Sequence, residues 1–138
     1  MNSQHYDLIT IGGGSGGLAV AIKAADMGRK VAIIEANRIG GTCVNNGCVP
    51  KKVMWYAANL AHAVDDAAGF GIPADRGRTD WRRLVDGREQ YIRNITTWWN
   101  EHVNDEGIDR IAGQARFVNN HSVEVGGLVY TADHIVIA

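Results

Sequence analysis

The sequence lacks several features that mark specialised classes of protein. Only 2 of its 138 residues are cysteine and 2 are proline. Two cysteines are too few for a small secreted fold that is held together by many disulfides. The net charge of −1 provides no basic surface for nucleic acid. No apolar run approaches the roughly 20 residues that cross a bilayer. With 46% hydrophobic residues, the chain has instead the balance of one soluble globular domain.

Glycine is the residue in surplus. There are 17 glycines, and five of them fall within Gly12 to Gly17, interrupted only by Ser15. A flexible linker would spread its glycines among polar residues, whereas this cluster directly follows the apolar, β-branched segment 6–11. Residues 18–27 then have apolar side chains at helical spacing, and 30–35 forms a second apolar segment. Strand, glycine turn, helix and strand in this order predict a parallel βαβ unit.

The rest of the chain predicts two long helices followed by short strands. Residues 36–48 are interpreted as a glycine-rich loop, and 69–80 as a polar connector whose arginines form a solvated surface. We expect helices from Pro50 to about Ala68 and from Trp81 to about Asn104, the second capped by Thr79 or Asp80. The expected strands are 108–112, 115–118, 122–125, 128–130 and 134–137, with a hairpin turn at Gly126-Gly127.

The glycine turn has the spacing of a dinucleotide-binding site. In the pattern Gly12-x-Gly14-x-x-Gly17, one glycine permits a tight turn, one lets the backbone approach a pyrophosphate, and one lets the helix pack on the strand. The phosphates would lie at the helix N-terminus. Glu35 ends the second strand and could accept hydrogen bonds from a ribose. Because its carboxylate would repel a 2′-phosphate, the site favours FAD or NAD over NADP, without choosing between them.

Cys43 and Cys48 are the only cysteines. They could be two unreactive buried thiols, and a zinc site is not expected because two more ligands at suitable spacing are missing. A redox disulfide fits better, although not within a regular helix. Residues five apart in a helix have Cα atoms about 8.6 Å apart, whereas a disulfide requires less than about 7 Å. We therefore expect a distorted segment, which Gly47 and Pro50 would permit.

These residues resemble one family closely. The run from Gly40 to Lys52 is similar to the redox-disulfide signature of the FAD-dependent pyridine nucleotide–disulfide oxidoreductases. Within it, Pro50-Lys51-Lys52 resembles glutathione, trypanothione and large thioredoxin reductases. Residues 53–58, 115–118 and 131–135 look most like bacterial glutathione reductases. The resemblance implies an α/β fold: a Rossmann-like FAD-binding domain with a parallel βαβ core, long helices and a small β-meander, in a three-layer arrangement.

The resemblance also implies which residues would hold the cofactor. The FAD pyrophosphate would be cradled by Gly12, Gly14, Ser15, Gly16 and Gly17. Glu35 would hold the adenosine ribose, and Ala115 would touch the adenine through its backbone. The cofactor contacts implied within the redox segment are Gly41, Thr42, Cys43, Cys48 and Lys51. No metal is expected.

The implied chemistry is disulfide reduction. Cys48 would be the charge-transfer thiol against the flavin, Cys43 the interchange thiol that attacks the substrate, and Lys51 would lie near flavin N5. Electrons would pass from NADPH to FAD, then to the Cys43–Cys48 disulfide, then to glutathione disulfide. Ser15 and Trp99 are expected to contact that substrate. Trp99 stands where glutathione reductases have a tyrosine, and the alternative is that Trp98 and Trp99 are ordinary core and surface residues.

Residues 1–138 would thus be the N-terminal part of an FAD-binding domain. The NADPH and interface domains would be absent, as would the catalytic His–Glu pair of the partner subunit, so the fragment alone is expected to be inactive. We expect a homodimer for the parent enzyme and, from the missing signal peptide and the redox use of cysteine, a cytoplasmic location. Asn46, which replaces the usual valine, is either solvated or tunes the loop. The alternatives are another flavoprotein disulfide reductase, a non-catalytic FAD module, or an NAD-dependent dehydrogenase with incidental cysteines.

Overall fold

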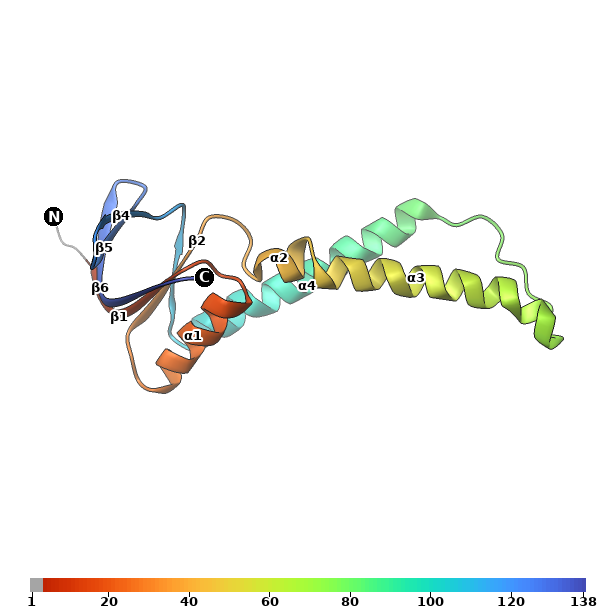
Figure 1. Ribbon diagram of the computed structural model, residues 1–138, viewed down its shortest axis with the longest axis horizontal. Coiled ribbons are helices and arrows are strands. Elements are labelled where there is room, and N and C mark those ends of the chain that lie inside the picture. Colours follow the sequence, from red (N-terminus) through yellow and green to blue (C-terminus); the bar gives the residue numbers. More distant parts are fainter. Residues whose placement is uncertain (1–3) are drawn as a thin grey trace.

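The computed structural model describes residues 4–138, so the first three residues of the predicted domain lie outside the described range (Figure 1). In chain order the elements are β1 (Gln4–Ile11), α1 (Ser15–Asp26), β2 (Val31–Glu35), α2 (Gly41–Asn45), α3 (Cys48–Ala67), the 3-10 turn η1 (Ala68–Phe70), α4 (Trp81–Asp105), β3 (Asp109–Ala112), β4 (Arg116–Asn119), β5 (Ser122–Val125) and β6 (Leu128–Ile137).

The strands form one six-stranded sheet in the order β3-β2-β1-β6-β5-β4. Strand β1 is parallel to β2 and to β6, and β2 is parallel to β3. The predicted parallel βαβ unit, β1-α1-β2, is therefore confirmed, and the α/β fold class with it. The predicted meander is also present, because β4, β5 and β6 are antiparallel neighbours.

The meander is not built from separate strands at 128–130 and 134–137, and that prediction was wrong. Strand β6 instead runs without interruption from Leu128 to Ile137 and pairs with β1 from Tyr130 to Ile137. Ala132, between the two predicted strands, is buried, and its N–H donates to the carbonyl oxygen of His121 at 3.0 Å. One continuous strand therefore joins the meander to the parallel core.

Both faces of the sheet are covered by apolar side chains. On one face, Leu18 and Ala21 of α1 pack with Val31 and Ile33 of β2. On the other, Val123 of β5 belongs to a cluster that includes residues of β1 and β2. This arrangement places the carboxyl ends of β1 and β2 at the start of α1, where the glycine turn lies.

The long helices form a hairpin that extends away from the sheet (Figure 1). Helix α4 begins where predicted, because the side chain of Asp80 accepts a hydrogen bond from the Arg83 N–H at 3.0 Å. Helix α3 starts at Cys48, two residues before the predicted start at Pro50. Proline is tolerated in the first turn of a helix because the N–H it lacks has no partner there. None of the residues of α3 is fully buried.

Candidate functional site

The glycine turn joins the end of β1 to the start of α1. Gly12 has φ +110°, a conformation that side chains disfavour. A Cβ on Gly17 would overlap the carbonyl oxygen of Gly12, and a Cβ on Gly12 would overlap that of Ala138. The first and last glycines of the pattern are therefore required by close backbone approach, whereas the sequence predicted a packing reason for only one glycine of the pattern.

The N-terminus of α1 is open to an anionic ligand. Its N-cap is Gly14, no side chain caps it, and its first turn contains no acidic residue. The first N–H groups of a helix have no partner within the helix and carry the positive end of its dipole. Ser15 and Gly16, which supply two of these groups, are exposed, whereas Gly17 is buried against the turn. The chain here fits a pyrophosphate.

Glu35 contacts the glycine turn directly. Its Oε2 accepts a hydrogen bond from the Gly13 N–H at 2.7 Å, and its Oε1 accepts one from the Asn37 N–H at 2.7 Å. The sequence predicted only a ribose contact for this residue. Each carboxylate oxygen can accept more than one hydrogen bond. After the bonds to the Gly13 and Asn37 N–H groups, the Glu35 carboxylate can therefore still accept hydrogen bonds from ribose hydroxyls. The carboxylate also ties the end of β2 to the glycine turn.

A cavity of about 900 Å³ lies beside the glycine turn. It brings together five of the predicted cofactor residues, namely Gly12, Gly14, Glu35, Gly41 and Thr42. It is also lined by Asn45, Asn46 and Glu89, of which only Asn46 was singled out from the sequence. Glu89 comes from the middle of α4, and nothing in the pattern of an amphipathic helix distinguishes it from a surface acid.

The two cysteines lie on different helices, which agrees with the expectation that they would not share one regular helix. Residues 36–48 are not a continuous loop, which corrects the sequence interpretation: Cys43 lies within the short helix α2, and Cys48 is the first residue of α3. The helices are separated at Asn46 and Gly47. A Cβ on Gly47 would lie 2.9 Å from the Thr42 carbonyl oxygen, so the tight connection requires glycine.

The environments of the two thiols differ. Cys43 is half-buried and Cys48 is exposed. A hydrogen bond between the sulfurs is the main cause that raises the pKa of Cys43 and lowers the pKa of Cys48, and the cations Lys51 and Lys52 lower the pKa of Cys48 further. These opposite shifts favour the thiolate form at Cys48 over that at Cys43.

Ser15 and Trp99 meet at a second, smaller cavity of about 170 Å³, together with apolar residues such as Leu18 and Val44. Trp99 also packs against the core beneath α1, whereas the adjacent Trp98 is exposed and stacks on His102, with ring centroids 4.9 Å apart. The structure thus brings the two predicted substrate residues together while Trp99 also serves the core.

Ala115 and Lys51 do not line the cavity beside the glycine turn. Ala115 packs against the core of the second face, in the segment between β3 and β4. The N–H of Gly113 in this segment donates to the Glu35 carbonyl oxygen at 3.0 Å, which brings the segment next to the end of β2. Lys51 is exposed on α3, one turn from Cys48.

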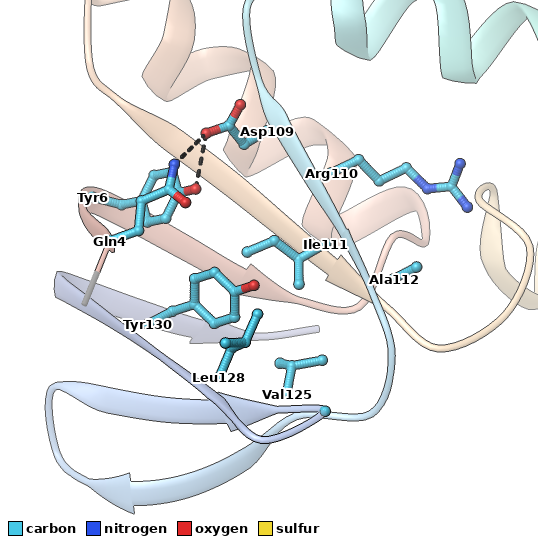
Figure 2. A pocket seen from close by; sticks show the side chains of 10 residues that line it. Gln4, Tyr6, Asp109, Arg110, Ile111, Ala112, Val125, Leu128 and Tyr130 are labelled. Atoms are coloured by element: carbon cyan, nitrogen blue, oxygen red, sulfur yellow. Dashed lines mark hydrogen bonds between the residues drawn. The ribbon is translucent and has the colours of Figure 1, made fainter. Parts of the chain in front are cut away.

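Another cavity, of about 540 Å³, lies between β3 and the hairpin of β5 and β6 (Figure 2). It contains none of the predicted site residues. Its polar centre is Asp109, whose Oδ2 accepts hydrogen bonds from the Tyr6 hydroxyl at 2.8 Å and from Gln4 Nε2 at 3.2 Å. Burial and the contact with Asp109 raise the pKa of Tyr6 well above its ordinary value.

In residues 4–138 no cluster of three or more potential metal ligands occurs. No helix in that range is long and apolar enough to span a membrane.

The chain is similar to known proteins over nearly its whole length. Residues 6–138 match the family model described as pyridine nucleotide-disulphide oxidoreductase. The chain is 42% identical over 133 residues to a glutathione reductase of Nostoc sp., covering 96% of this chain and 29% of that protein. It is 44% identical over 144 residues to a glutathione reductase of Schizosaccharomyces pombe, covering 99% of this chain and 31% of that protein. The chain thus spans less than a third of the length of these curated relatives. It belongs to the pyridine nucleotide-disulphide oxidoreductase family.

Proposed function

We propose that this chain is the FAD-binding, redox-disulfide part of an NADPH-dependent reductase that acts on glutathione disulfide. The observation that carries the proposal is the placement of the cysteine pair beside the glycine turn. Cys43 lies in the short helix α2, which begins against that turn, and Cys48 begins the next helix. Gly41, the first residue of α2, packs so tightly on the glycine turn that a Cβ there would lie 2.7 Å from Gly14 Cα. The segment bearing Cys43 is thereby joined to the wall of the cofactor cavity.

The residues present fit FAD. The open N-terminus of α1 would take the pyrophosphate and Glu35 the adenosine ribose, while Ala115 would touch the adenine from the segment whose Gly113 N–H bonds to the Glu35 carbonyl oxygen. FAD, when bound, supplies two electrons taken from NADPH. Beside it, Thr42, Cys43, Cys48 and Lys51 would complete the contacts, and Lys51 and Lys52 would stabilise the thiolate that the electrons produce.

The thiol chemistry follows from the difference between the two cysteines. Two electrons and one proton convert the Cys43–Cys48 disulfide to a Cys48 thiolate and a Cys43 thiol. After losing its proton, Cys43 attacks one sulfur of glutathione disulfide, breaks that S–S bond and releases one glutathione thiolate. The Cys48 thiolate then attacks Cys43 Sγ, which restores the internal disulfide and releases the second glutathione thiolate.

The remaining parts of the reaction are proposed to lie outside residues 1–138. These are the NADPH-binding domain, the interface domain and the His–Glu pair that would take the Cys43 proton from a partner subunit of a homodimer. The relatives that this chain matches are about three times its length. We accordingly expect no NADPH-dependent turnover from the 138 residues alone.

The proposal is tested by the absorption spectrum of the FAD-loaded protein. Reduction by two electrons should produce a long-wavelength charge-transfer band from the Cys48 thiolate. Cys48→Ser should abolish the band, and the matched variant Cys43→Ser should retain it because only the outer thiol is lost. A Cys48→Ser protein that keeps the band, or a wild-type protein that never shows it, would overturn the assignment.

A further inference from the structure

Helix α2 is too short to hold its own shape. It has five residues, and an isolated helical turn is unfavourable because nucleation fixes several residues for a single hydrogen bond. Its N-cap is Gly40, at φ +98°, with no side chain to cap the turn. Two backbone hydrogen bonds lie at its ends. The Val44 N–H donates to the Gly40 carbonyl oxygen over a long distance of 3.4 Å, and the Asn46 N–H donates to the Thr42 carbonyl oxygen at 2.9 Å. Something outside the backbone must hold this turn.

The side chain of Asn45 provides that support. Its Nδ2 donates to the carbonyl oxygen of Gly41 at 2.9 Å and to that of Ile39 at 3.1 Å, with the Arg38 carbonyl oxygen further away at 3.4 Å. The two hydrogens of the amide therefore have two close acceptors. One is in the first turn of α2 and the other is in the segment that follows β2, so a single side chain ties the helix to its approach.

The same segment is anchored to the glycine turn. The Gly40 N–H donates to the Gly13 carbonyl oxygen at 2.7 Å, and Ile39 is buried in the core beneath α1. Through Asn45, these fixed points are connected to the turn that carries Cys43. On the other side of the pair, Cys48 is held by the start of α3, where the Lys51 N–H donates to the Gly47 carbonyl oxygen at 3.1 Å.

We propose that Asn45 is a positioning residue for the cysteine pair: its amide holds the α2 turn that carries Cys43 against the Gly47 connection to Cys48. The proposal rests on the redox role proposed above and extends it. Asn45 lies between the two cysteines in sequence and acts through Cys43. It has no direct part in the transfer of electrons.

Loss of the amide should be visible at Cys48. The groups that act on this thiol are Cys43 from α2 and Lys51 and Lys52 from α3. If the α2 turn loosens, the Cys43 donor moves away while the two lysines stay, and the thiolate loses its main support. The pKa of Cys48 should then rise toward the ordinary value for cysteine, although the fold as a whole is retained.

The test compares three variants of the full chain in the reduced state. Asn45→Leu has similar volume and no donor. Asn45→Ser can still reach the Gly41 carbonyl but not that of Ile39, and it serves if the leucine variant does not fold. Asn100→Leu is the matched control, because Asn100 Nδ2 makes the same kind of bond, to the Thr96 carbonyl oxygen at 2.9 Å, but on α4. Circular dichroism establishes that each variant is folded.

The measurement is the rate at which iodoacetamide alkylates Cys48, followed by mass spectrometry of the peptide across a range of pH. Below neutral pH the rate in Asn45→Leu should fall between about two- and tenfold, the effect of one ordinary hydrogen bond. The rate at alkaline pH should be unchanged, Asn45→Ser should lie in between, and Asn100→Leu should match the wild type. A shift of the same size in Asn100→Leu, or none in folded Asn45 variants, would overturn the role of Asn45.

Failure of the proposed function gives a different result. If the oxidised wild-type chain does not form a bond between Cys43 and Cys48, seen as a mass loss of two hydrogens, both the redox role and the positioning role are wrong. If that disulfide forms and the Asn45 variants keep the wild-type pH profile, only the positioning role is wrong.

Discussion

Two neighbouring glycines at the start of α1 should respond in opposite ways to the same substitution. A Cβ on Gly16 would lie 3.6 Å from the Ala138 Cβ, which is an ordinary contact. A Cβ on Gly17 would overlap the carbonyl oxygen of Gly12, an atom of the backbone that cannot rotate out of the way. Neither residue has a positive φ. Substitution by alanine therefore tests the close approach of helix and strand without backbone strain.

The magnitudes follow from two opposing effects. Alanine in place of glycine within a helix stabilises the folded state by roughly 0.5–1 kcal/mol, because it restricts the unfolded chain. An extra carbon in a site without space costs about 1–3 kcal/mol, because backbone or neighbouring atoms must shift. Both variants gain the first effect and only Gly17→Ala suffers the second. Their free energies of unfolding should therefore differ by about 1–3 kcal/mol.

The assay is urea unfolding followed by circular dichroism, without added cofactor, so that phosphate binding does not contribute. Gly16→Ala should unfold at a higher urea concentration than the wild type and Gly17→Ala at a lower one, with similar slopes. If the two variants are equally stable, or if Gly17→Ala is the more stable, α1 does not pack on the turn as closely as described, and the reason given for the glycine pattern is wrong.

Two further predictions concern single hydrogen bonds. Asp80→Ala should cost about 1 kcal/mol in the free energy of unfolding, because it removes the cap on the Arg83 N–H. Asp86→Ala in the same helix is its control, since the exposed 3.9 Å ion pair of Asp86 with Arg82 contributes little; an equal loss in both would contradict the capping role. Tyr6→Phe should cost about 1 kcal/mol by removing the bond to Asp109. In absorbance titrations, the hydroxyl of Tyr6 should ionise only when the chain unfolds in alkali. Folded wild type and folded Tyr6→Phe should therefore show the same number of titrating tyrosines. If the folded variant shows one fewer than the wild type, this prediction is wrong.

Much of the fold follows from patterns that are local in sequence. The apolar segment before the glycine cluster, the helix after it and the second apolar segment predicted β1, α1 and β2, because each element buries one face and the glycines mark the turn between them. Glu35 was placed at the end of β2 by the same reasoning. The reach of a disulfide predicted that the two cysteines would not lie within one regular helix, but it did not predict the short helix α2.

Other features could not be read from the sequence. Two separate strands were predicted at 128–130 and 134–137, but pairing with β1, a strand more than 100 residues earlier, joins them into the single strand β6. The short helix α2 has too few residues to show apolar periodicity, and the Asn45 amide and the buried Val44 both hold it in place. Glu89 joined the wall of the cavity only because α4 folds back beside α2.

The sequence by itself therefore predicted most of the elements, the family and the groups proposed to react, because these depend on spacing within a few dozen residues. Only the tertiary structure decided how those groups are held: Glu35 clamping the glycine turn, Asn45 supporting the turn of Cys43, and Ser15 meeting Trp99. The physical reason is that each of these contacts depends on the positions of atoms that lie on different elements. Their distances are set by how helices and strands pack, which no local pattern encodes.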